Sequence, residues 1–132
     1  MNEPLWISKR GVLAMHSQQL AEHGGSAGIR DESLLDSALA KPHTIVAYSE
    51  PTPDIFRLAA SYAFGIARNH AFVDSNMRTA LVVAATLLDR NGWEIEAPKE
   101  ETYTTFLRLA KGSLNEEDLA AWFRQHCGPL KT

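Results

Sequence analysis

The stretch of residues 55–91, IFRLAASYAFGIARNHAFVDSNMRTALVVAATLLDRN, decides the fold, because two apolar runs stand on either side of a polar loop. Just before it, Thr52-Pro53-Asp54 offers a capping hydroxyl, a proline suited to the first helical position and an acid for the first turn. From Ile55 to Ala67 the chain is apolar nearly all round and rich in small residues, which predicts a buried central helix. From Asn76 to Asn91 apolar residues recur at helical spacing, which predicts a second helix.

Helical signals continue towards the N-terminus. A helix is expected to follow a Ser8 N-cap and to end at Gly24-Gly25. A second, short helix is expected to begin at Asp31 and to end at Pro42, because a proline cannot continue a helix. Residues Thr44 to Tyr48 are β-branched and aromatic, which favours a short extended flap.

The C-terminal third follows the same pattern. Trp93-Glu94-Ile95 predicts a short strand or an extended return, and Lys99 to Lys111 predicts a further helix. Ser113-Leu114-Asn115-Glu116 has the form of a capping box for a last helix that Gly128-Pro129 ends. Together the signals predict one all-α domain over residues 1–132, a compact bundle of about six helices.

Composition excludes several classes of protein. With 45% hydrophobic and 22% charged residues the chain is typical of a globular domain, and its net charge of −3 argues against direct binding to nucleic acid. The single cysteine, Cys127, cannot form an internal disulfide, which favours a reducing compartment and a cytoplasmic protein. The most apolar stretch, Ala80 to Leu88, is too short to span a membrane, and Met1-Asn2-Glu3-Pro4 lacks the pattern of a signal peptide.

The polar loop between the two apolar helices predicts an anion site. At the start of a helix the backbone N–H groups of Ser75, Asn76 and Met77 are expected to point outwards, and the helix dipole adds partial positive charge. Arg78 in the first turn opposes that dipole, so its presence there indicates an anionic ligand.

Three other residues of the loop have distinct expected roles. Asp74 supplies a hard oxygen ligand suited to a Mg²⁺ ion that bridges phosphates, and His70 could accept a proton from an attacking hydroxyl. Phe72 is expected to bury its ring in the core and to anchor the loop. The other histidines share no metal-ligand spacing and are expected to be incidental: His16, His23, His43 and His126.

The pattern His-x-Phe-x-Asp-x-Asn-x-Arg at residues 70–78 resembles the Fic-domain motif, and more closely that of the Doc (death on curing) toxin branch of the Fic/Doc family. The flanking residues are similar as well: His23-Gly24-Gly25, Ala67-Arg68, Arg78-Thr79-Ala80-Leu81 and Arg90-Asn91-Gly92. The resemblance implies an all-α Fic fold and an enzyme that uses ATP and Mg²⁺ to modify a protein hydroxyl.

The resemblance also implies roles and partners. His70 would be the base and Asp74 the metal ligand, with Ser75, Asn76, Met77 and Arg78 at the phosphates and Arg68 as a weaker phosphate residue. Doc-type toxins transfer the γ-phosphate of ATP to elongation factor Tu, which implies that target and a Phd-like antitoxin as partners. The flap expected at Thr44 to Tyr48 would dock the target segment by strand pairing.

Two positions depart from the Doc pattern. Ser75 replaces the usual Ala or Gly, and Met77 stands where Doc proteins carry Lys and AMP-transferring relatives carry Gly. Met77 therefore leaves two alternatives open beside the kinase, namely a Fic-type AMP-transferase and a catalytically weakened binding partner of an antitoxin.

Overall fold

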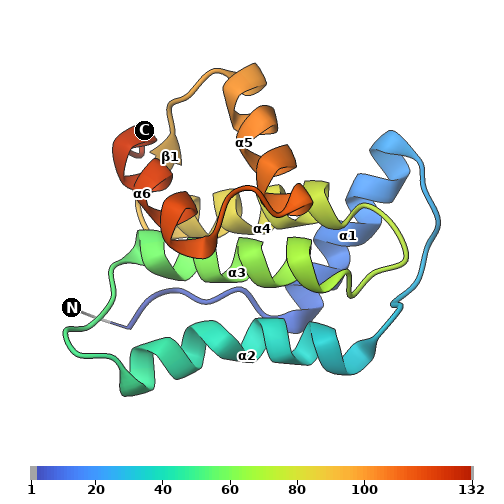
Figure 1. Cartoon of the computed structure of the whole chain (residues 1–132), viewed down its shortest axis with the longest axis horizontal. Coiled ribbons are helices and arrows are strands. Elements are labelled where there is room, and N and C mark those ends of the chain that lie inside the picture. The colour runs from blue at the N-terminus through green and yellow to red at the C-terminus, as the bar shows by residue number, and fades with distance from the viewer. Residues whose placement is uncertain (1–2, 132) are drawn as a thin grey trace.

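The computed structural model describes residues 3–131 and confirms the all-α prediction, with six helices and two very short strands in that part of the chain (Figure 1). The helices are α1 (Lys9–His23), α2 (Glu32–Tyr48), α3 (Ile55–Asn69), α4 (Asn76–Arg90), α5 (Lys99–Lys111) and α6 (Glu116–His126). The strands are β1 (Trp93–Ile95) and β2 (Cys127–Pro129), paired antiparallel with Glu94 opposite Gly128.

Helix α3 is the buried centre of the molecule, as its sequence predicts. Figure 1 shows it between α2 on one side and α5 and α6 on the other, with α4 behind it, and α3 packs against all four. Small residues allow close approach: a Cβ added at Gly65 would lie 2.8 Å from the Cβ of Ala38 in α2. The alanine- and glycine-rich face thus brings α2 and α3 nearly into backbone contact.

The prediction that Pro42 ends the second helix is wrong. Helix α2 runs through Pro42 to Tyr48, so Thr44 to Tyr48 are its last turns and not an extended flap. The physical reason is burial, because Leu35, Ala38 and Pro42 lie on one face of the helix and are all buried against the core. The free energy gained by burying this face offsets the loss of the single backbone hydrogen bond that proline removes.

Apart from the end of α2, the helix boundaries are close to their predicted places, with two shifts in the capping residues. Ser8 and Asp31 cap α1 and α2 through their side chains, as expected. Helix α3, however, is capped by Asp54 rather than by Thr52. The capping box of α6 is formed by Asn115 and Asp118, two residues after the predicted pair.

The apolar run within α4 is packed inside the bundle. Val83, Ala84, Leu87 and Leu88 are fully buried there. Within residues 3–131 no helix combines the length and the apolar character that crossing a bilayer requires.

Candidate functional site

The candidate site is the loop of residues 70–75, which joins α3 to α4. Both ends of the loop adopt the left-handed conformation, at His70 (φ 49°, ψ 48°) and at Ser75 (φ 62°, ψ 31°). Non-glycine residues rarely adopt this conformation, which persists where surrounding contacts hold it. The contacts around the loop therefore determine its shape.

The ring of Phe72 anchors the loop in the core, as predicted. It is 1% exposed, and its ring stacks on that of His16 with centroids 3.8 Å apart. The backbone of Phe72 is also held, because its N–H donates to Oδ1 of Asn76 and its carbonyl accepts from Nδ2 of Asn76. The sequence predicts that Asn76 contacts a phosphate. In the structure its side chain closes the loop through these two hydrogen bonds.

The carboxylate of Asp74 is exposed and is oriented by two backbone amides. The N–H of Ser26 donates to Oδ2 at 3.2 Å, and the N–H of Ser75 donates to Oδ1 at 2.8 Å. These two hydrogen bonds, that of Ser26 first, lower the pKa of Asp74 below its ordinary value. The carboxylate is therefore ionised at neutral pH, as a metal ligand must be.

The first turn of α4 presents unpaired backbone donors. Its N-cap, Ser75, makes no side-chain capping bond, and within the described residues 3–131 the N–H groups of Asn76, Met77 and Arg78 have no acceptor. The expectation that the N–H of Ser75 is also free is wrong, because that group donates to Asp74. The available amides are shifted one residue along the chain, to the first three residues of the helix.

The connection between α1 and α2 holds the other end of the loop, a contact that the sequence did not reveal. The guanidinium of Arg30 donates to the carbonyls of His70 (2.6 Å) and Asn69 (3.0 Å). Its neighbour Ile29 pairs with Phe72 in an isolated antiparallel bridge. This segment, rather than Thr44 to Tyr48, is the extended stretch that lies against the loop.

His16 is not incidental, contrary to the expectation from sequence. It is 5% exposed, and its Nε2 lies 2.9 Å from the carbonyl oxygen of Asp74. The available signal was its place on the apolar face of α1, four residues after the buried Val12. A histidine on such a face needs a polar partner when it is buried.

One open pocket of about 330 Å³ brings together six of the eight predicted site residues. Its lining includes His70, Asp74, Ser75, Asn76, Met77 and Arg78, together with Ala67, Val73 and Ala110. Arg78 is exposed and makes no ion pair within 4 Å with the carboxylates of residues 3–131. Phe72 is buried and, like Arg68, is outside the pocket lining. The guanidinium of Arg68 lies 5.3 Å from the ring centre of Phe64.

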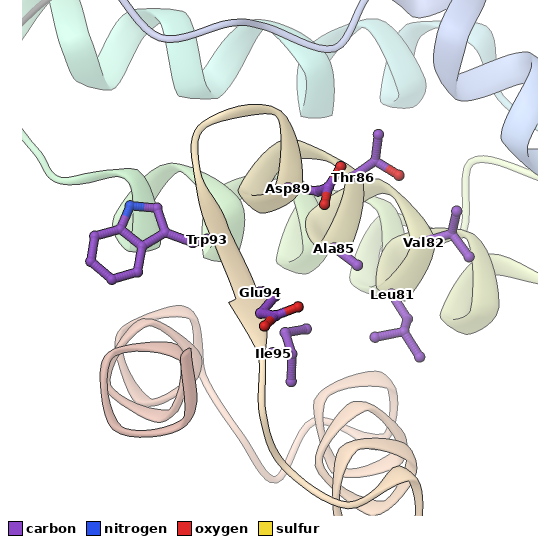
Figure 2. Close-up of a pocket in the computed structure, with 8 residues that line it drawn as sticks. All are labelled: Leu81, Val82, Ala85, Thr86, Asp89, Trp93, Glu94 and Ile95. Atoms are coloured by element: carbon purple, nitrogen blue, oxygen red, sulfur yellow. The ribbon is translucent and has the colours of Figure 1, made fainter. Parts of the chain in front are cut away.

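A second pocket, of about 430 Å³, lies along α4 and β1 and contains none of the predicted site residues. Figure 2 shows Leu81 and Ile95 facing the space between the two elements, while the ring of Trp93 points away from them. Its only charged lining residues are Asp89 and Glu94, which disfavour an anionic ligand. Of these two pockets, the loop pocket is the one with chemistry for phosphate.

Comparisons with known proteins agree with this location. The model of the Fic/DOC family matches residues 6–88, which include the whole loop. The chain is 32% identical over 123 residues to the protein kinase doc of Escherichia phage P1, a match that covers 92% of this chain and 95% of that protein. It is also 42% identical over 74 residues to Toxin Doc of Mycolicibacterium smegmatis, covering 56% of this chain and 57% of that protein.

Proposed function

The chain belongs to the Fic/Doc family, and from this premise we propose that it is a Doc-like toxin that transfers the γ-phosphate of ATP to a hydroxyl of elongation factor Tu. The observation that carries the proposal is the shared pocket, in which His70, Asp74 and the first turn of α4 meet. A base, a hard oxygen ligand and free anion-binding donors are the groups that phosphoryl transfer requires.

The phosphates of ATP would lie at the N-terminus of α4. Three adjacent N–H groups are free there, the helix dipole adds partial positive charge, and the guanidinium of Arg78 has no carboxylate partner within residues 3–131. Arg78 can therefore form charge-assisted hydrogen bonds to phosphate oxygens.

The donor set at Asp74 fits a Mg²⁺ ion that is held mainly by phosphates. Within residues 3–131 no three His, Cys, Asp or Glu side chains cluster as a metal cage, so one carboxylate would be the protein ligand. Mg²⁺ is often bound in this way, with one or two carboxylates and the remaining positions filled by phosphate and water. When bound, the ion would neutralise charge on the phosphates of the nucleotide.

His70 would act as the general base. Its imidazole accepts the proton of the target hydroxyl while the hydroxyl oxygen attacks the γ-phosphorus. The bond between that phosphorus and the β–γ bridging oxygen breaks, and ADP leaves. The bonds from Arg30 to the carbonyls of Asn69 and His70 hold the residue at the pocket.

The partner of such a toxin would be an antitoxin. One relative carries the name Toxin Doc, and a toxin that modifies the translation machinery needs a neutralising partner in its own cell. We expect a Phd-like protein with a segment that folds as a helix on this chain.

The test uses two labelled nucleotides. Purified protein is incubated with elongation factor Tu, Mg²⁺ and either γ-labelled or α-labelled ATP, and label on the target is measured. The inactive control is His70→Asn, since asparagine tolerates the left-handed backbone of this position. The matched control is His43→Asn, an exposed histidine of α2 outside the pocket.

Each outcome selects one function. Transfer of γ-label that is lost in His70→Asn and retained in His43→Asn supports the kinase. Transfer of α-label supports the AMP-transferase that Met77 leaves open. Transfer of neither label, together with tight binding of an antitoxin, supports the binding partner.

A further inference from the structure

A buried histidine outside the pocket, His16 of α1, contacts the candidate metal ligand through the backbone. Its Nε2 lies 2.9 Å from the carbonyl oxygen of Asp74, 58 residues away in the sequence. A carbonyl oxygen can only accept, so Nε2 carries the proton and donates it. The imidazole also stacks on Phe72, with 10° between the ring planes, which fixes the plane in which the donor lies.

This hydrogen bond holds the carbonyl end of the peptide group between Asp74 and Ser75. The carbonyl of that peptide accepts from His16, and its N–H donates to the carboxylate of Asp74 at 2.8 Å. Both polar ends of one peptide are therefore held. The peptide leads directly into the left-handed Ser75 and from there into the free amides of α4.

We propose that His16 is a positioning residue for phosphate transfer. Its hydrogen bond sets the orientation of the peptide between Asp74 and Ser75, and with it the direction of the Asp74 carboxylate and the first turn of α4. The inference rests on the proposed function, which it deepens. Small displacements of a positioned group lower the rate of a chemical step strongly, by as much as about 100-fold for 1 Å.

Two substitutions separate the hydrogen bond from the packing. His16→Phe keeps an aromatic ring beside Phe72 but removes the donor, while His16→Gln keeps an N–H donor but removes the ring. His43→Phe is the matched control, because the ring of His43 also stacks on an aromatic ring, that of Trp6, with centroids 3.8 Å apart. Within residues 3–131, His43 makes no hydrogen bond to the loop of residues 70–75, whereas His16 does.

The first measurement needs no nucleotide. Amide hydrogen exchange of Ser75 and the backbone ¹⁵N shifts of residues 75–78 report the order of the loop in the free protein. The second measurement titrates MgATP and follows the same shifts, and the third measures phosphate transfer to elongation factor Tu as a function of Mg²⁺ concentration.

In His16→Phe we expect exchange of the Ser75 amide to rise by about tenfold or more and kcat to fall by about 10–100-fold, with a higher Mg²⁺ requirement. His16→Gln is expected to stay within about threefold of the parent in both readouts, and His43→Phe to match the parent.

Two results would overturn the proposal. One is exchange of the Ser75 amide in His16→Phe that equals that of the parent. The other is a loss in His16→Gln as large as in His16→Phe, which would assign the effect to ring packing. If His16→Phe does not fold, His16→Gln is the deciding variant. Exchange of its Ser75 amide that is raised about tenfold or more over the parent would contradict the role of the hydrogen-bond donor. If the parent transfers no phosphate, the proposed function fails while the exchange experiment still tests His16.

Discussion

The side-chain amide of Asn76 forms two hydrogen bonds with a single residue, Phe72. Its Oδ1 accepts from the N–H of Phe72, and its Nδ2 donates to the carbonyl of Phe72, each at 3.0 Å. The pair closes the loop over residues 72–76 and leaves one N–H of the amide for a ligand. A residue that resemblance assigns to phosphate binding is thus also part of the loop's own framework.

Replacement of Asn76 should therefore lower stability as well as activity. In Asn76→Ala both bonds are lost and two backbone groups of Phe72 lose their partner, so we expect the free energy of unfolding to fall by about 1–3 kcal/mol. Urea unfolding measures this change. A variant with parental stability and no phosphate transfer would show that Asn76 acts on the nucleotide alone.

Gly25 controls the space beside Asp74. A Cβ at Gly25 would lie 2.9 Å from Oδ2 of Asp74, whereas a Cβ at Gly24 would meet nothing within 4 Å. Both glycines have positive φ, so both alanine variants should lose stability to a similar degree, about 1–2 kcal/mol. Only Gly25→Ala should raise the Mg²⁺ concentration needed for transfer, and an equal rise in Gly24→Ala would show that backbone strain is the cause.

Asp74→Asn tests the carboxylate directly. A neutral amide is a poorer ligand for a hard dication, so the Mg²⁺ titration of phosphate transfer should shift to higher concentration. The amide has one acceptor oxygen and so keeps one of the two hydrogen bonds from Ser26 and Ser75. Because Asp74 is exposed, thermal unfolding without nucleotide should change little. An unchanged Mg²⁺ titration would argue against a metal role for this residue.

Met77 lines the pocket in the first turn of α4. Substitutions at this position should distinguish a kinase from an AMP-transferase. In a kinase, Met77→Lys should add a charge-assisted bond to phosphate of about 1.5–3 kcal/mol, equivalent to about 10–150-fold in affinity or rate. In an AMP-transferase, Met77→Gly should instead increase α-label transfer by opening access to the backbone. If neither variant gains while a Met77→Ala control stays folded, Met77 does not contact phosphate.

The thiol of Cys127 should react slowly with alkylating reagents at neutral pH. Burial, with a smaller contribution from the negative charge of Glu96, raises its pKa to about 11. Because the thiolate is the reactive form, the rate of alkylation by iodoacetamide should keep rising with pH until about pH 11 in the folded protein. The denatured chain is the control, and its rate should level off near the ordinary pKa of a cysteine. A plateau at that lower pH in the folded protein would contradict the burial of this thiol.

Some features of this protein are determined within a few residues of sequence. The caps at Ser8 and Asp31 and the end of α5 at Lys111 agree with prediction, because capping bonds join neighbours in the chain. The start of α4 at Asn76 also agrees with prediction, although no side-chain bond caps it. The pattern at residues 70–78 likewise indicated the residues that the pocket brings together. The composition of α3 indicated its burial, since Ile55 to Ala67 are apolar nearly all round and rich in small residues.

Other features are decided only by packing between distant segments. Pro42 stays inside α2 because burial of its face against the core outweighs a local helix-breaking signal. His16 reaches Asp74, and Arg30 reaches His70, because the fold places α1 and the connection that follows it beside the loop. The N–H of Ser75 donates to the neighbouring carboxylate of Asp74, whose carbonyl and carboxylate are held by the distant His16 and Ser26. Local sequence specifies the conformations that a segment favours, whereas tertiary contacts supply the free energy that holds a residue in an unfavourable one.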